Sequence, residues 1–237
     1  ISSLGTGARA GLMRQILIGC HRPITHAMCA ALAHPEEVVF FVGSLDAFDR
    51  VLAVEAIDRI FLIFWSWRIP ADVIERYKPV GFHMTSLPFG RGGHPLQNLI
   101  ESGNAHTELC MLVLDAELDA GAVLDRQPLC IEGPADEIYA RGGLLACQRI
   151  RAYLDAGCSW PAIPQQGIPV EFQRRTPAMS ELPREGGLEG LLRHIRMLDA
   201  EGYPHAFIEY GAFRLELRRA TLRADRVLTD CKISVRD

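Results

Sequence analysis

Four continuous apolar segments, separated by stretches with helical spacing, dominate the first third of the chain. The apolar segments are 14–19, 38–43, 57–65 and 80–84, and the helical ones are 24–33, 46–55 and 70–77. Strands that are apolar along their whole length are typical of parallel sheets, because helices cover both faces of such sheets. The alternation therefore predicts an α/β fold with a Rossmann-like, mostly parallel sheet flanked by helices.

The next part of the chain is expected to extend this sheet. Strands are predicted at 108–114 and 122–131, with the acidic turn 115–121 between them, and a helix is predicted at 135–156. We expect the strand pair to be an antiparallel extension. Five prolines between residues 158 and 187 then indicate a linker that lies over the first domain.

The last segment predicts a small unit with one helix and three strands. The helix is expected at 188–198, and the strands at 206–210, 213–218 and 227–235. We therefore expect four parts, which are a flexible N-terminal extension (1–13), a main domain (14–157), a linker (158–187) and a small, strand-rich C-terminal α+β module (188–237). The module is short enough to be a docked unit rather than a catalytic domain.

Charge and hydropathy exclude several function classes. The net charge of −4 gives no general attraction to nucleic acid or to an anionic membrane. The apolar run 59–65 is too short for a membrane span. Residues 1–12 lack a hydrophobic signal core, so we expect a cytoplasmic protein.

The cysteines and one glycine-rich stretch favour structural interpretations. Seven cysteines occur without a Cys-x-x-Cys pair, so we expect neither a zinc site nor a disulfide framework but small buried hydrophobes in a reducing cytosol. The stretch Gly5–Gly11 resembles a phosphate loop but precedes the first strand. That position favours a flexible end.

His83 and Asp119 are the candidate catalytic pair. Each lies where a predicted strand gives way to a loop, and ligands bind at such strand ends in open α/β sheets. Histidine titrates near neutrality, and a carboxylate can orient an imidazole or hold its proton. Asp115 and Glu117 are rivals of Asp119 in the same acidic turn. A structural role for His83 is the alternative.

Aromatic residues end the neighbouring strand, and two common catalytic motifs are absent. Phe64, Trp65 and Trp67 are expected beside the strand of His83, either as core or as a flat wall for an aromatic ligand. The sequence contains no Gly-x-Ser-x-Gly nucleophile elbow and no His-Glu-x-x-His metal motif.

Taken together, these motifs resemble the family of formyltransferases that use 10-formyltetrahydrofolate. The resemblance depends on His83 with Ser86-Leu87-Pro88, then Arg91-Gly92 with Pro95, and Leu118-Asp119-Ala120-Gly121, where the family usually has Leu-Asp-Thr-Gly. It covers most of residues 14–220 and implies that 14–157 is the catalytic domain. The amino-acid sequence around His83 is most similar to that of members that act on amino sugars of bacterial surface glycans, such as those of the pseudaminic acid pathway.

One position departs from the family pattern. The family carries a catalytic asparagine two residues before the histidine, where this chain has Gly81. An oxyanion donor of that kind contributes about 3–4 kcal/mol to the transition state. Three explanations remain open: a substitute donor, a subfamily that works without it, or a protein that binds with little turnover. The candidate substitutes are Asn98, Asn104, Thr85 and Ser66.

The resemblance implies roles for further residues. His83 would take the proton of the attacking amine and Asp119 would hold the imidazole. The reaction would need no metal. The folate donor would bind against nine further residues: Trp65, Leu87, Pro88, Phe89, Gly90, Arg91, Gly92, Asp115 and Leu118.

The acceptor follows from the charge of the distal region. Residues 171–226 hold ten arginines and nine acidic residues, a near balance that makes methionyl-tRNA the less favoured acceptor. A primary amine on a nucleotide-linked sugar suits the chain better, and the distal module would cover the acceptor or form a homodimer contact. The alternatives are a formyltetrahydrofolate hydrolase and a non-catalytic binder of folate or nucleotide sugar.

Overall fold

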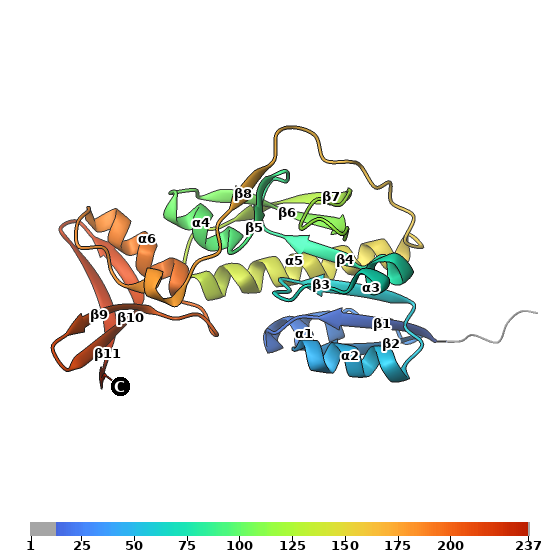
Figure 1. The fold of residues 1–237 in the computed structure, drawn as a ribbon, viewed down its shortest axis with the longest axis horizontal. Coiled ribbons are helices and arrows are strands. Elements are labelled where there is room, and N and C mark those ends of the chain that lie inside the picture. Colours follow the sequence, from blue (N-terminus) through green and yellow to red (C-terminus); the bar gives the residue numbers. More distant parts are fainter. Residues whose placement is uncertain (1–12, 237) are drawn as a thin grey trace, which may run out of the picture.

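The computed structural model describes residues 13–236, in which the strands form one large sheet and two small ones (Figure 1). The large sheet has the order β2-β1-β3-β4-β6-β7. Its strands are β1 (Arg14–Gly19), β2 (Glu37–Val42), β3 (Arg59–Ile63), β4 (Val80–His83), β6 (His106–Val113) and β7 (Val123–Cys130). The small sheets have the order β11-β10-β9 and the pair β5-β8. Their strands are β5 (Phe89–Gly92), β8 (Val170–Phe172), β9 (Ala206–Tyr210), β10 (Phe213–Arg223) and β11 (Arg226–Val235).

The direction of the strands confirms the predicted fold class. Strands β2, β1, β3 and β4 are parallel, while β6 pairs antiparallel with both β4 and β7. The chain passes from β1 to β2 on one side and to β3 on the other. This reversal places a crevice at the carboxyl ends of β1 and β3.

Alternating side chains bury both faces of the parallel strands. Ile16 and Ile18 of β1 belong to the main core cluster with residues of α5, whereas Leu17 packs with Phe48 of α2 on the opposite face. This two-sided burial explains why the parallel strands are apolar without interruption. The continuous apolar pattern in the sequence therefore correctly predicted that helices cover both faces of the parallel strands.

The helices begin and end within a few residues of their predicted bounds. They are α1 (Pro23–Ala30), α2 (Leu45–Val54), α3 (Ala71–Tyr77), α4 (Pro95–Glu101), α5 (Ala135–Asp155) and α6 (Leu188–Leu198), with a short 3-10 helix at Pro177–Ser180. In α2 the Ser44 side chain accepts the N–H of Ala47 and caps the helix. The helix expected at 24–33 is shorter, because it ends at Ala30.

The pair β5-β8 was not predicted. The sequence favoured a loop at 87–93 and a linker at 158–187, yet Phe89 to Gly92 pairs with Val170 to Phe172. Gly90 and Gly92 have positive φ, so the segment carries turn signals although it pairs as a strand. Figure 1 shows the linker passing over the top of the molecule before it returns through β8.

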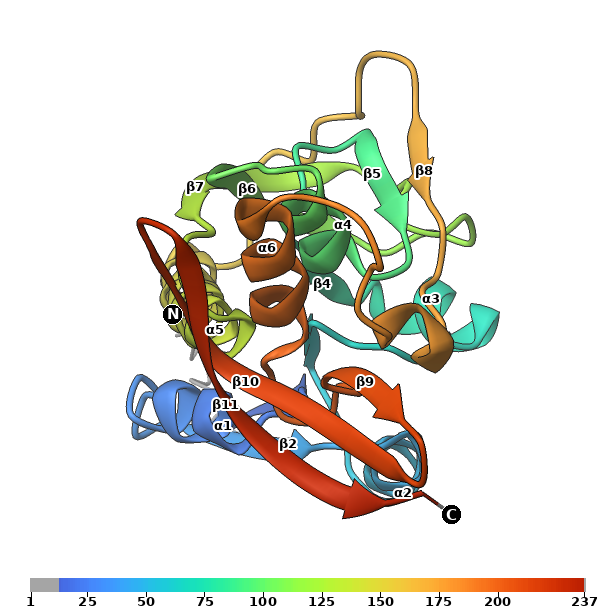
Figure 2. The ribbon, with the colours of Figure 1, turned by 90° about the vertical axis from the view of Figure 1, so that its left-hand side faces the viewer.

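The C-terminal unit shares the main core. Ile195, Met197 and Leu198 of α6 and Ala206 of β9 belong to the same core cluster as the large sheet. Figure 2 shows β10 and β11 as a long twisted ribbon beyond α6. Strand β10 extends to Arg223, past the predicted end at 218, and its pairing with β11 shifts between Arg218 and Thr221.

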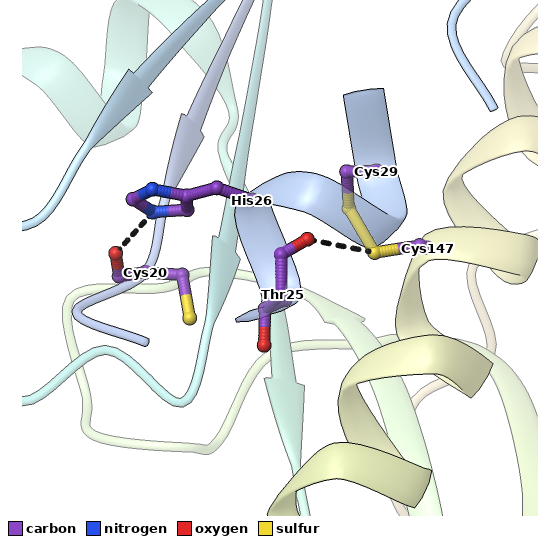
Figure 3. Close-up of a disulfide and its surroundings, with 5 residues drawn as sticks. All are labelled: Cys20, Thr25, His26, Cys29 and Cys147. Carbon is purple, nitrogen blue, oxygen red and sulfur yellow. Dashed lines mark hydrogen bonds between the residues drawn. A yellow bond between two sulfur atoms is a disulfide. The ribbon is translucent and has the colours of Figure 1, made fainter. Parts of the chain in front are cut away.

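The expectation for the cysteines is wrong at two positions. Cys29 of α1 and Cys147 of α5 form a disulfide across 118 residues of sequence (Figure 3). Cys20 and Cys110 are free and buried, as expected. Only the packing of α1 against α5 brings the pair together, so no spacing in the sequence could indicate it.

Two further expectations concerned the glycine-rich stretch and membrane spans. The stretch Gly5–Gly11 lies outside the described residues. Among residues 13–236, no helix is both long and apolar enough to cross a bilayer.

Candidate active site

A cavity of about 1160 Å³ opens where the carboxyl ends of β1, β3 and β4 meet. Its walls come from the segments that follow these strands and from the turn after β6. The distal chain adds the 3-10 helix Pro177–Ser180 and the end of α6. Lining residues include His21, Phe64–Ile69, Gly81–Met84, Arg91–Pro95, Asp115–Asp119, Arg174–Pro177 and Gly202–Pro204. The cavity therefore lies at the edge of the sheet where ligands of this fold class bind.

His83 closes β4 and faces this cavity as a buried side chain. Its Nε2 lies 2.7 Å from the carbonyl oxygen of Gly90, and its Nδ1 lies 3.5 Å from Oδ2 of Asp119. A carbonyl oxygen only accepts, so Nε2 carries the proton of the neutral ring. Nδ1 then carries the free lone pair of the ring beside a carboxylate, so it is the atom that can take up a proton.

Asp119 occupies a turn with a demanding backbone. Its φ is 53°, in the left-handed region that Asp tolerates better than most residues. Its Oδ2 also accepts the N–H of Gly92 at 2.9 Å. A Cβ on Gly121 would lie 1.7 Å from the carbonyl oxygen of Val113, so the turn requires glycine there. These constraints hold the carboxylate beside His83.

Gln165, which sequence reasoning placed in a linker, holds the same turn. Its Nε2 donates to the carbonyl oxygens of Asp119 and Gly121 at 2.7 and 2.9 Å. Its Oε1 accepts from Nε and Nη2 of Arg91, whose Nη1 donates to Glu117 at 3.0 Å. No local pattern in the sequence marks Gln165, because its partners lie more than 40 residues away.

The structure separates the remaining predicted residues into two groups. Trp65, Arg91, Gly92, Asp115 and Leu118 line the cavity with His83 and Asp119. Four others are not among its lining residues: Leu87, Pro88, Phe89 and Gly90. Leu87 is buried in a small apolar cluster, Phe89 packs on Phe172, and the Gly90 carbonyl holds His83.

One wall of the cavity is apolar and aromatic. It includes Leu62, Trp65, Trp67 and Leu112, and the rings of Trp65 and Trp67 lie 4.7 Å apart between centroids. The buried Nε1 of Trp65 has no hydrogen-bond partner among the described residues. An apolar, aromatic surface of this kind suits an aromatic heterocycle.

Gly81 also lines the cavity, and its surroundings are apolar. A Cβ at this position would lie 2.7 Å from Cδ2 of Leu114. Leu114 therefore fills the space into which a side chain at position 81 would point.

Of the four suggested substitute donors, only Ser66 lines the cavity. The side-chain amides of Asn98 and Asn104 donate to main-chain carbonyls, and Thr85 is fully buried with its hydroxyl near Gly90. Ser66 is exposed and follows β3.

The lining of the cavity also includes basic side chains. Arg68 and Arg174 line it, and neither forms an ion pair among residues 13–236. His94 lies there too, and its Nδ1 accepts the N–H of Arg175 at 3.0 Å. Burial is the largest cause that lowers the pKa of His94, and the positive charges of Arg174 and Arg175 lower it further. The ring is therefore neutral near pH 7.

Comparison with known proteins identifies the family. A structure described as a methionyl-tRNA formyltransferase from Clostridium thermocellum matches this chain with a TM-score of 0.87 and 33% sequence identity, over 94% of this chain and 99% of the other. The chain belongs to the formyltransferase family. A family model for the C-terminal domain of methionyl-tRNA formyltransferase also matches residues 177–234 of this chain. The resemblance seen in the sequence is thereby confirmed.

Two more distant structures share the fold of this chain. A sugar N-formyltransferase from a Shewanella species matches with a TM-score of 0.70 at 12% identity, over 90% of this chain and 100% of the other. HypX from Aquifex aeolicus, in complex with tetrahydrofolic acid, matches with a TM-score of 0.72 at 18% identity, over 88% of this chain and 38% of HypX. The chain spans 64% or less of the length of the curated methionyl-tRNA formyltransferases that it matches.

Proposed function

We propose that this protein transfers a formyl group from 10-formyltetrahydrofolate to a primary amine. The observation that carries the proposal is the position of His83, whose Nδ1 lies 3.5 Å from Asp119 at the wall of the large cavity. Family membership supplies the reaction class, and the pair supplies the base that the reaction needs.

The pair handles the proton of the acceptor. An amine must be neutral to attack a formyl carbon, and it loses a proton as the new C–N bond forms. The bond between the formyl carbon and the folate nitrogen would break in turn, and that nitrogen would take up a proton as tetrahydrofolate departs. Nδ1 of His83 accepts the proton of the amine, and the carboxylate of Asp119 stabilises the imidazolium. The hydrogen bond from Gly92 keeps the carboxylate in place during this transfer.

The cavity fits the proposed donor in size and in chemistry. The folate donor supplies an activated formyl group. The apolar wall at Trp65 and Trp67 would hold its heterocycle. The cavity of about 1160 Å³ lies at the upper end of typical ligand sites, which leaves room for an acceptor beside the donor.

Ser66 is the candidate donor to the formyl oxygen. It is the only suggested substitute for the missing asparagine that lines the cavity, and a side chain at Gly81 would require Leu114 to shift. A single hydroxyl donor accounts for activity with Gly81 in place. Substitution of Ser66 by alanine therefore tests this part of the proposal.

We propose a nucleotide-linked amino sugar as the acceptor. Arg68 and Arg174 face the cavity without ion-pair partners among the described residues, and phosphate groups would supply such partners. Several distal arginines are already committed. Arg196 donates to main-chain carbonyls. Five others form ion pairs: Arg175, Arg193, Arg214, Arg219 and Arg226. This commitment weakens the case for a nucleic-acid surface.

Methionyl-tRNA is the second candidate acceptor. The solved relative at 33% identity carries that description, and the matched C-terminal model comes from such proteins. The charge balance of the distal region opposes this candidate, and direct competition between acceptors decides between the two.

Labelled 10-formyltetrahydrofolate separates these functions in one assay. The protein is incubated with nucleotide-linked amino sugars, with methionyl-tRNA, or with no acceptor. We expect label on the amino sugar. Label on the tRNA assigns the second acceptor, formate released without acceptor indicates a hydrolase, and binding without turnover indicates a non-catalytic protein.

A further inference from the structure

His94 is a polar side chain of the cavity that the proton transfer at His83 does not use. It follows β5 by two residues and lines the cavity together with Arg91 and Gly92. Gly92 donates its main-chain N–H to Asp119, and two residues of chain span at most about 7 Å. His94 therefore lies at the same end of the cavity as His83 and Asp119.

Two contacts hold His94 and leave one of its ring nitrogens open. Its Nδ1 accepts the main-chain N–H of Arg175 at 3.0 Å, and the Asn98 amide donates to the His94 carbonyl oxygen at 2.9 Å. Because Nδ1 accepts, the proton of the neutral ring lies on Nε2. Nε2 forms no hydrogen bond within residues 13–236, and it is not one of the buried atoms that lack a partner. It is therefore a solvent-accessible N–H donor on a side chain that lines the cavity.

The residue that anchors His94 comes from the distal part of the chain, 81 residues away. Arg175 is itself fixed, because its guanidinium forms an ion pair with Glu101. A Cβ on Gly93 would lie 2.8 Å from Cα of Arg174, so glycine at this position permits the close approach of the two segments. The donor is thus held in place by contacts that only the folded chain provides.

The surroundings of His94 suit a sugar ring linked to a phosphate. The Tyr203 ring lies 5.7 Å from the His94 ring between centroids, and the Tyr203 hydroxyl donates to the buried Gln97 at 3.2 Å. Arg174 lines the same part of the cavity and forms no ion pair among the described residues. A fixed aromatic ring, a neutral donor and an available cation are the groups that would recognise a nucleotide-linked sugar.

We propose that His94 is a specificity residue for the acceptor, whose Nε2–H donates a hydrogen bond to a hydroxyl oxygen of the sugar ring that carries the reacting amine. The inference rests on the proposed function, because it concerns the acceptor of that reaction. The sugar ring then lies between the base at His83 and the donor at His94, and the two contacts orient the amine. A site that donates to a substrate oxygen discriminates against an analogue that lacks it.

Two substitutions of His94 separate the donor from the rest of the side chain. In His94→Asn the amide oxygen reaches as far as Nδ1 and can accept from Arg175, but the donor at Nε2 is lost. Asparagine also tolerates the left-handed backbone of this position, where φ is 54°. In His94→Gln the longer amide reaches as far as Nε2 and restores a donor. His34→Asn is the matched control, because His34 is exposed, lies outside the cavity lining and also accepts a main-chain N–H through Nδ1.

The measurement is kcat/KM for transfer of label from 10-formyltetrahydrofolate. The acceptors are the nucleotide-linked amino sugar that the wild type formylates fastest and its analogues that each lack one ring hydroxyl. With the complete sugar, we expect His94→Asn to lower kcat/KM by about tenfold, His94→Gln to lower it less, and His34→Asn to match the wild type. With the analogue that lacks the contacted hydroxyl, the wild type and His94→Asn should be equal, because neither makes the hydrogen bond. The KM for the folate donor should not change.

The outcomes distinguish this inference from the proposed function. Wild-type kcat/KM in His94→Asn with the complete sugar, or an equal loss in this variant with every analogue, overturns the inference and leaves formyl transfer standing. A wild type that formylates no nucleotide-linked amino sugar overturns the proposed acceptor and this inference with it. Circular dichroism of each variant shows whether it is folded.

Discussion

The large cavity and the C-terminal sheet use exposed surface in opposite ways. Around His83 and Asp119, hydrogen bonds join four segments of the chain, which are β4, β5, the turn that carries Asp119 and the linker that carries Gln165. On β10 and β11, several large apolar side chains contact solvent and have no cover in the described structure. The first region is already organised for a ligand, and the second lacks a partner.

The difference follows from how each region is specified. The geometry around His83 and Asp119 depends on glycines and long-range hydrogen bonds, so small changes there should sharply lower activity. The C-terminal sheet depends on the residue pattern along its strands, so changes at its exposed side chains should leave the chemistry unchanged. The predictions below test this separation.

The largest effect is expected from His83→Ala. Loss of a general base typically costs 10²–10⁴-fold in rate, and we expect formyl transfer to fall by about that factor with the fold intact. Labelled-formyl assays and circular dichroism measure the two properties. Asp119→Asn should lower the rate less. Wild-type turnover in His83→Ala would refute the assignment of the base.

Gly121→Ala should disrupt the turn that carries Asp119. Its Cβ would lie 1.7 Å from the Val113 carbonyl oxygen, so the backbone must move. We expect a loss of about 1–3 kcal/mol in the free energy of unfolding, together with a large loss of activity. Urea unfolding measures the first. Gly190→Ala, whose Cβ would meet nothing closer than 4.0 Å, is the matched control and should be neutral or stabilising. If the two variants behave alike, the turn is more tolerant than its geometry indicates.

Replacement of Cys29 and Cys147 by serine should lower stability by about 2–5 kcal/mol, because the disulfide closes a long loop. Urea unfolding with and without reductant measures this. Cys231→Ser is the control, since that thiol is free and exposed. A double serine variant as stable as the oxidised wild type would show that the crosslink is not formed in solution.

A gradual effect on stability is expected from pH. Burial lowers the pKa of His21, His94 and His194, so these rings bind protons more weakly when folded than when unfolded. Stability should therefore fall as pH drops below about 6.5, the ordinary histidine value, and the fall should end below the lowered pKa values. Unfolding midpoints between pH 8 and 5 measure the slope, and His94→Gln should reduce it. A stability that rises on acidification would contradict the sign.

Ser66→Ala offers a finer test within the cavity. If the hydroxyl assists the formyl oxygen, kcat should fall by about 10²-fold, the lower end for one oxyanion donor, with the KM for the acceptor little changed. Steady-state kinetics separates the two constants. An unchanged kcat would assign the oxyanion to another group.

Much of the fold could be predicted from sequence because its signals are local. The apolar strands, the proline at the start of α4 and the amphipathic α6 all report their own environment. The approach of His83 to Asp119 was also predictable, since both follow strand ends. Gln165, the β5-β8 pair and the Cys29–Cys147 disulfide were not, because each depends on residues far apart that only the completed fold brings together.

Gln165 lies beyond α5, in the linker, and this position limits how the protein can be divided. Cutting the chain after residue 157 would remove the amide that holds the Asp119 turn and would leave Arg91 with one partner fewer. It would also uncover the core residues against which α6 packs. A shortened version made for crystallography or engineering should therefore keep the linker and α6, because the domain boundary drawn on the sequence is not a boundary of the working unit.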